Sequence, residues 1–176
     1  QLLAEAGYPN GFETDFWIQP VVRASNPNPK RMAELIMADW AKVGVKTNPV
    51  TYEWADYQKR AKAGELTAGI FGWSGDNGDP DNFLSPLLAS SNAGNSNMAR
   101  FKNPEFDALL DKAIGLTNKE ERTALYKQAQ VIIHNQAPWI PVAHSVGFAP
   151  LSPRVKGYAQ SPFGYDAFYG VSVDGK

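Results

Sequence analysis

The sequence GWSGDNGDPDNF at residues 72–83 is the stretch from which the fold can be worked out. It follows the apolar run AGIF at residues 68–71 and precedes a leucine-rich segment at residues 84–88. Glycines allow the middle of this stretch to turn sharply, Pro80 suits the first turn of a helix, and Asp79 is placed to cap that turn. The stretch therefore predicts a strand, a loop and a helix in that order.

One carboxylate in this stretch has no evident structural role. The start of the helix accounts for Asp79, Asp81 and Asn82, whereas Asp76 lies earlier, in the glycine-flanked loop beside Trp73. Because the helix cap does not use its charge, the Asp76 carboxylate is free to pair with a cation. The sequence therefore predicts a cation-binding position at Asp76.

The rest of the chain predicts alternating strands and helices. Apolar alternation and turn signals predict strands, and periodic apolar residues between caps predict helices. A capping box at Thr117 is expected to open the longest helix, and Pro49 indicates an edge or a bulge in its strand. The strands are expected at 12–19, 45–53, 66–71 and 139–144, and the helices at 1–6, 29–43, 54–63, 104–114 and 118–137.

This order of elements is typical of an α/β layer, in which ligands bind beyond the carboxyl ends of the strands. Arg23 and Asp76 each follow a predicted strand directly, so we expect them to share one cleft. The Arg23 guanidinium is suited to donate two parallel hydrogen bonds to a carboxylate. From the residues alone, a solvated loop arginine is the simpler interpretation.

Two stretches together resemble the ligand-binding segments of the peptide-binding proteins that serve ABC transporters. They are GWSGDNGDPDNF at 72–83, and QPVVR at 19–23 followed by NPNP at 26–29. The resemblance is to the dipeptide-binding branch of the bacterial extracellular solute-binding proteins of family 5. It implies that Asp76 takes the free amino group of a bound peptide and that Arg23 takes its carboxylate. Further matching stretches are RMAE at 31–34, ADWAKVG at 38–44, YKQAQ at 126–130 and VKGY at 155–158.

The resemblance also implies the fold class and the domain organisation. The expected fold is α/β, part of the two-lobed periplasmic-binding-protein fold (type II, Venus-flytrap), and the chain matches the last third of such proteins. Residues 1–147 would form the C-terminal lobe portion with the binding loops, and residues 148–176 would cross the hinge and return to the first lobe. Without that lobe, the following aromatic residues are expected to be exposed: Phe163, Tyr165, Phe168 and Tyr169.

The function implied by the resemblance is that of the substrate-binding component of an ABC importer. Such a protein is expected to be periplasmic, monomeric and not an enzyme, to bind dipeptides or short peptides, and to dock on the permease subunits of the transporter. Trp73 either lines the ligand pocket or packs in the core, since a tryptophan at the end of a strand suits both. Ser74 and Gly75 are candidates to offer backbone groups to the ligand.

Several other functions remain open or are disfavoured by the sequence. Members of the same superfamily bind glutathione, haem, nickel complexes, longer peptides or sugars, and a peptide sensor or chaperone module is a further alternative. A hydrolase is disfavoured because no nucleophile with a neighbouring base is evident. A calcium loop beginning at Asp76 would place Asp81 where glycine is needed and Leu87 where glutamate is needed.

Composition excludes some classes of partner and site. The 176 residues carry a net charge of −1 without a long block of like charge, so neither nucleic acid nor an anionic membrane surface is expected as a partner. No apolar run is long enough to insert into a membrane. The chain has no cysteine, and its two histidines, His134 and His144, lie in different predicted elements. We therefore expect no disulfide, no metal site and no cofactor.

Overall fold

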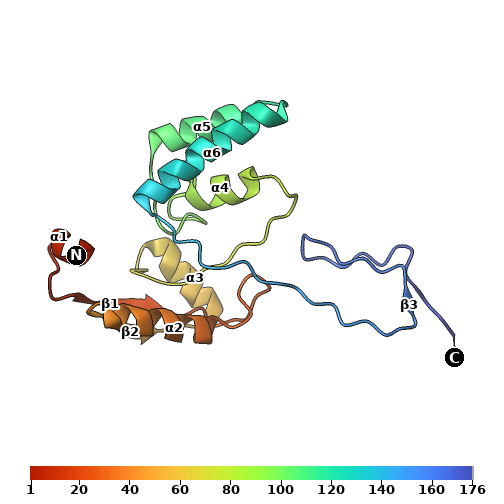
Figure 1. The fold of residues 1–176 in the computed structure, drawn as a ribbon, viewed down its shortest axis with the longest axis horizontal. Helices are drawn as coiled ribbons and strands as arrows, with labels where there is room; N and C mark the ends of the chain where they lie inside the picture. Colours follow the sequence, from red (N-terminus) through yellow and green to blue (C-terminus); the bar gives the residue numbers. More distant parts are fainter. Residues whose placement is uncertain (176) are drawn as a thin grey trace.

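The computed structural model describes residues 1–175 as a compact part followed by an extended arm, defined here as residues 148–175. Figure 1 shows the arm projecting away from the compact part. The elements are α1 (Leu2–Glu5), β1 (Phe12–Trp17), α2 (Pro29–Lys42), β2 (Val45–Val50), α3 (Trp54–Ala63), α4 (Asp81–Leu88), a 3-10 turn η1 (Ser90–Asn92), α5 (Pro104–Ile114), α6 (Lys119–Gln136), β3 (Val155–Lys156) and β4 (Ser172–Val173). No described helix has the length and apolar character needed to cross a membrane.

Strands β1 and β2 form a parallel pair joined by helix α2. Their register runs from Phe12 opposite Val45 to Trp17 opposite Val50. Helix α2 starts at Pro29, where the side chain of Asn28 accepts a hydrogen bond from the Arg31 N–H, 3.1 Å away. A βαβ unit of this kind is the basic element of α/β folds, as the sequence predicts.

The glycines that precede the two parallel strands touch each other. Gly11 precedes β1 with φ +77°, and Gly44 precedes β2 with φ +90°. A Cβ atom on Gly11 would overlap the carbonyl group of Gly44. The close approach of the two backbones therefore requires glycine at position 11.

The predicted third strand is reduced to a single bridge. Gly69 pairs in parallel with Trp17; the Trp17 N–H donates to the Ala68 carbonyl at 2.7 Å and the Ile70 N–H donates to the Trp17 carbonyl at 3.3 Å. The prediction of a strand over 66–71 is wrong in extent, since only Gly69 pairs with β1, and it does so at Trp17, the last residue of that strand. β1 thus lies between β2 and this segment, so among residues 1–175 β2 is an edge strand, the first of the two possibilities, edge or bulge, that Pro49 indicated.

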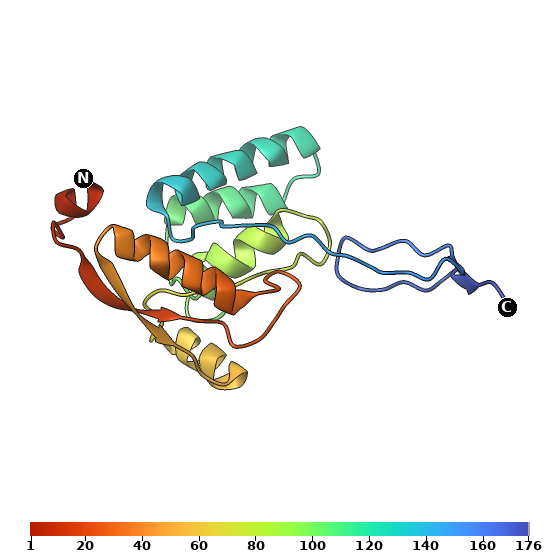
Figure 2. The same cartoon turned by 60° about the horizontal axis from the view of Figure 1, so that its bottom comes forward.

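Helices α2 and α3 cover opposite faces of this small sheet, as Figure 2 shows. Adjacent residues of a strand point to opposite faces, and accordingly Phe16 packs against Trp40 of α2 while Trp17 packs against Tyr57 of α3. The Tyr57 hydroxyl lies 3.3 Å from the carbonyl oxygens of both Trp17 and Ile70, and burial raises its pKa well above the usual value. Tyr57 therefore stabilises the sheet at the point where β1 ends.

Helices α4, α5 and α6 form a separate layer with its own apolar core. The buried residues of this core are Leu87, Leu88, Phe106, Leu110, Ala113, Leu125, Tyr126, Ala129 and Ile133. Asn103 caps α5 by accepting from the Phe106 N–H at 2.9 Å, and Asn118 caps α6 by accepting from the Glu121 N–H at 2.9 Å. The prediction of a capping box at Thr117 is therefore wrong by one residue, because the amide of Asn118 takes the capping role.

The predicted strand at 139–144 is also wrong. This segment is irregular and makes no strand pairing within the part of the chain that the structure describes. Extended backbone becomes a strand only when a neighbour satisfies its N–H and C=O groups.

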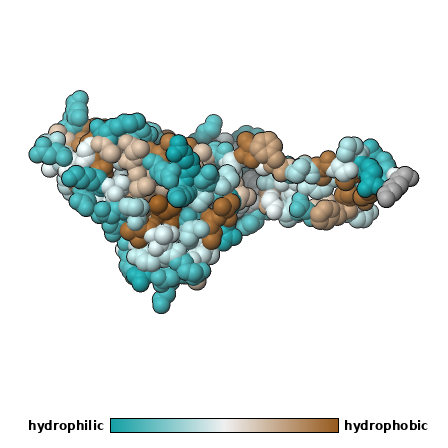
Figure 3. Space-filling view, turned by 90° about the horizontal axis from the view of Figure 1, so that it is seen from below, coloured by the Kyte–Doolittle hydropathy of each residue, from teal (hydrophilic) through white to brown (hydrophobic). Residues whose placement is uncertain are grey.

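Along the arm, the short strands β3 and β4 pair in an antiparallel manner, and several large apolar side chains are exposed. Figure 3 shows hydrophobic residues in brown on this projection. As predicted, Tyr165, Phe168 and Tyr169 are exposed, by 59%, 67% and 102%. Phe163 is the exception: it is half-buried, and its ring lies beside Gly78.

A candidate ligand-binding cleft

A cleft of about 400 Å³ lies between the chain that follows β1 and the loop that precedes α4. Of the predicted site residues, Arg23, Trp73, Ser74 and Asp76 line it, whereas Gly75 does not. Its other lining residues are Gln19, Ala24, Ser25, Trp54, Phe71 and Gly72. The structure thus places a cationic and an anionic side chain, from distant parts of the sequence, in one hollow.

A larger hollow of about 570 Å³ is lined in part by the 66–71 segment. Its lining is mainly apolar and includes Trp40, Met98 and Trp139, and Arg100 is its only charged residue among those described. Because it offers no pair of opposite charges, it does not match the recognition of a zwitterion that the sequence predicts.

Arg23 is presented to the cleft by a tight turn. The Arg23 N–H donates to the Asn26 carbonyl at 3.1 Å, and the Asn26 N–H donates back to the Arg23 carbonyl at 2.9 Å. The guanidinium carbon lies 5.1 Å from the centre of the Trp54 ring, within the range of a cation–π contact. Arg23 makes no ion pair within residues 1–175, so its charge is available to an anion.

Asp76 is held by Asn82, a residue whose role the sequence analysis missed. The Asp76 N–H donates to Asn82 Oδ1 at 3.0 Å, and Asn82 Nδ2–H donates to Asp76 Oδ2 at 3.5 Å. The carboxylate is exposed and makes no ion pair with any described residue. Asn82 lies in the first turn of α4, six positions after Asp76, and no sequence motif signals a side-chain contact of this kind.

Trp73 lies at the cleft and outside the apolar core clusters. Its indole Nε1–H donates to the Asn82 carbonyl at 2.8 Å, and the residue is 36% exposed. Of the two interpretations that the sequence left open, the structure favours a pocket wall. Gly75 instead packs against Phe83: a Cβ atom at this position would lie 2.6 Å from the Phe83 ring.

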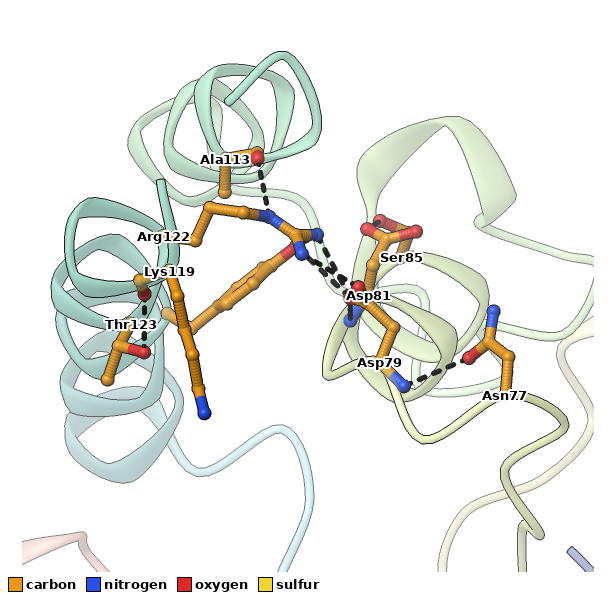
Figure 4. Close-up of polar contacts among 9 residues, drawn as sticks. Asn77, Asp79, Asp81, Ser85, Ala113, Lys119, Arg122 and Thr123 are labelled. Carbon is orange, nitrogen blue, oxygen red and sulfur yellow. Dashed lines mark hydrogen bonds and ion pairs between the residues drawn. The ribbon is translucent and has the colours of Figure 1, made fainter. Parts of the chain in front are cut away.

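A second polar cluster joins the start of α4 to α6 (Figure 4). Arg122 Nη1–H donates to Asp79 Oδ2 at 2.8 Å, and Arg122 Nη2–H donates to Asp79 Oδ1 at 3.1 Å. These hydrogen bonds hold the pKa of the Asp79 carboxyl below its usual range and raise the pKa of Arg122. Arg122 also donates to the Ala113 carbonyl at 3.0 Å and to the Tyr126 hydroxyl at 2.9 Å.

Asp79 Oδ1 also accepts from the N–H of Asp81, the first residue of α4, at 2.9 Å. The N-cap position itself is held by Pro80, so Asp79 contacts the helix start from one residue earlier than predicted. Its partner Arg122 lies 43 residues away in the sequence. The ion pair was therefore missed, since sequence patterns report local spacing only.

Chemically, the cleft offers opposite charges to the two ends of a zwitterion. It has one accessible carboxylate, one accessible guanidinium and two tryptophans. Neither histidine is among the residues that line it, so Ser74 has no histidine base in the cleft. Within residues 1–175, no three His, Asp or Glu side chains gather closely enough to hold a metal ion.

A family model described as bacterial extracellular solute-binding proteins, family 5, matches residues 1–95 of the chain. Among curated relatives, heme-binding protein A of Haemophilus influenzae is 92% identical over the whole chain, which covers 32% of that relative. The dipeptide-binding protein of Escherichia coli is 49% identical over 98% of the chain, again covering 32% of the relative. The chain thus spans about a third of the length of these proteins.

Solved structures show the same likeness. The structure of HbpA2 from Haemophilus parasuis matches with a TM-score of 0.89 and 55% identity, over 98% of this chain and 34% of that one. A dipeptide-binding protein from Pseudoalteromonas, in complex with Met-Leu, matches with a TM-score of 0.86 and 40% identity, with the same coverage. The predicted resemblance and the predicted fold class, α/β and part of a two-lobed binding-protein fold, are confirmed.

Proposed function

Because this chain belongs to the bacterial extracellular solute-binding proteins of family 5, we propose that it is part of the substrate-binding component of an ABC importer and binds dipeptides or other short peptides. The observation that carries the proposal is that Asp76 and Arg23 line the same cleft. Neither side chain forms an ion pair with another described residue. Membership of a binding-protein family, and not of an enzyme family, agrees with this role.

The proposed recognition uses both ends of the peptide. An unmodified peptide carries an ammonium group and a carboxylate, which would pair with Asp76 and Arg23. Two residues span at most about 7 Å in an extended chain, so fixing both ends selects short ligands. Trp73 and Trp54 would contact the peptide side chains, and Ser74 would offer a backbone group; Gly75, which does not line the cleft, would not contact the ligand.

The proposed domain organisation follows the same reasoning. Residues 1–147 would form part of the C-terminal lobe, and residues 148–176 would cross the hinge to a first lobe supplied by the longer protein. The exposed aromatic residues of the arm support this proposal, because such surfaces are normally covered. The complete protein would be periplasmic and monomeric, and would deliver its ligand to the permease subunits of the transporter.

Haem is the second candidate ligand, favoured by the name of the relative that is 92% identical. The rings of Trp54 and Trp73 offer flat surfaces to a macrocycle. However, no His, Cys, Met or Tyr is present among the described residues that line the cleft, so they supply no ordinary axial ligand for haem iron. Glutathione, longer peptides, sugars and a sensory or chaperone role are the remaining alternatives.

Titration calorimetry on the full-length protein tests the proposal. We expect one unmodified dipeptide to bind, and its N-acetylated and C-amidated forms to bind much more weakly, because each lacks one terminal charge. Equal binding of the three forms, or binding of haemin but of no peptide, would overturn the proposal.

A further inference from the structure

We propose that Arg122 is a positioning residue for Asp76: through Asp79 and the first turn of α4, it fixes the loop that carries the ligand-binding carboxylate. This inference rests on the proposed function, since it assigns Arg122 a role in the affinity for the ammonium group of a peptide. Arg122 itself belongs to α6 and is not among the residues that line the cleft.

The first link is the ion pair between two elements. The two hydrogen bonds from Arg122 to Asp79, at 2.8 and 3.1 Å, match the planar fork of a guanidinium to a carboxylate, an arrangement that fixes orientation as well as distance. The side chains are only 25% and 29% exposed. The Ala113 carbonyl and the Tyr126 hydroxyl hold the guanidinium from α5 and α6, so the fork is fixed on the helical layer.

The second link runs from Asp79 into α4 and its preceding loop. Asp79 Oδ1 accepts from the Asp81 N–H at 2.9 Å, and the Asp79 N–H donates to Asn77 Oδ1 at 3.0 Å. Figure 4 shows both contacts beside the ion pair. The Asp79 side chain therefore connects α6 to the first turn of α4, and its backbone connects that turn to the loop.

The third link reaches the cleft. Asn82 follows Asp81 in the same helical turn, and its side chain contacts both the N–H and the carboxylate of Asp76. Its carbonyl accepts from the indole of Trp73 at 2.8 Å. A shift of the α4 start would therefore move the anionic group and one wall of the cleft together.

A purely structural role for Arg122 would give a different result. If the ion pair only stabilised the packing of α4 on α6, its loss would lower the free energy of unfolding without a specific effect on Asp76. The experiment must therefore measure the coupling between Arg122 and Asp76 in ligand binding, and the mobility of the loop without ligand.

The test uses the full-length protein with Arg122→Gln, Arg122→Lys and Asp79→Asn, each with and without Asp76→Asn. Calorimetry gives the dipeptide affinity, and amide hydrogen exchange reports on residues 72–83 without ligand. Arg31→Gln, which removes an exposed ion pair with Glu34 on α2, is the matched control.

We expect Arg122→Gln and Asp79→Asn to weaken dipeptide binding about tenfold, but by less than about twofold when Asp76 is already Asn. Amide exchange in the loop should rise, Arg122→Lys should give an intermediate effect, and Arg31→Gln should change neither quantity. Because Asp79→Asn breaks the same ion pair, the test does not depend on one variant folding.

Unchanged loop exchange, or equal weakening with and without Asp76→Asn, would overturn the positioning role. If the unsubstituted protein binds no dipeptide, the proposed function is overturned by that result alone. Loop exchange then still decides whether Arg122 fixes the loop.

Discussion

At the scale of single residues, Asp76 and Arg23 reach the cleft with charges that no described residue neutralises. A charge pair formed with a ligand is strong only when closure of the protein around the ligand removes water. The exposed state of both side chains in this chain is thus consistent with a site that the other lobe would complete.

We expect Asp76→Ala and Arg23→Ala each to weaken dipeptide binding by about 30-fold or more, because the ligand charge would be left buried without a partner. Calorimetry on the full-length protein measures this effect. Asp39→Ala, which removes an exposed ion pair with Lys42, is the control and should leave affinity unchanged. A loss of less than about threefold for either cleft variant would contradict the two-charge model.

Asp79 should make stability depend on acid pH. Arg122 lowers the pKa of Asp79 in the folded protein, whereas the unfolded value is about 3.9. The ion pair therefore contributes stability above about pH 4, and this contribution is lost as the pH falls through the lowered pKa of the folded state. In urea unfolding, Asp79→Asn should be less stable than the unsubstituted protein at pH 7. The difference should shrink below pH 4; a constant difference would contradict this prediction.

At the scale of secondary structure elements, local signals predicted the helices well and the strands only in part. Caps and apolar periodicity lie within the helix itself, so α2, α3 and α5 begin within one residue of the expected position. A strand also needs a neighbour, and the sequence does not show that β1 ends at Trp17 or that residues 139–144 find no described partner.

For the cleft, the sequence likewise predicted the two charged residues but not the contacts that hold the Asp76 loop in place. Arg23 and Asp76 were found because each follows a strand and lies in a recognisable stretch. The contact of Asn82 with Asp76 and the ion pair of Arg122 with Asp79 depend on how the helices pack, over 6 and 43 positions of sequence. Tertiary contacts of this kind leave no local pattern.

The start of α6 provides a direct test of the capping residue. Asn118→Ala should lower the free energy of unfolding by about 1 kcal/mol, because the Glu121 N–H loses its acceptor. Thr117→Ala, the matched control, should cost less than about 0.5 kcal/mol. Denaturant unfolding of both variants measures the difference, and a larger effect at Thr117 would restore the original prediction of its capping role.

The βαβ unit depends on the contact between Gly11 and Gly44. Gly11→Ala should destabilise the protein by about 2 kcal/mol or more, since it combines a positive φ with an overlap against backbone that cannot move aside. Gly115→Ala is the control: its φ is −75° and the nearest atom to a new Cβ lies 3.7 Å away. The midpoint temperature of thermal unfolding should be clearly lower for Gly11→Ala than for Gly115→Ala. Equal midpoints would show that the backbone at Gly11 and Gly44 can shift to accommodate a Cβ atom.

At the scale of the whole molecule, the arm exposes large aromatic side chains that we propose are covered in the full-length protein. Phe148, Phe168 and Tyr169 are exposed by 86%, 67% and 102%. In the isolated chain, chymotrypsin should cleave after these residues before it cleaves the compact part, because exposed and weakly packed segments are cut first. In the full-length protein the same bonds should be protected, and rapid cleavage there would contradict the proposed return of the arm into a first lobe.

The outer strand β2 has a consequence for how the protein behaves in concentrated solution. An open sheet edge presents N–H and C=O groups that can recruit a strand from another molecule, the first step towards aggregation. Pro49 removes one donor from the β2 edge, and Lys46 places an exposed positive charge on it. The side of the sheet that faces outward is thereby protected against fibril-like growth, including during folding, when edges of this kind are most accessible to other chains.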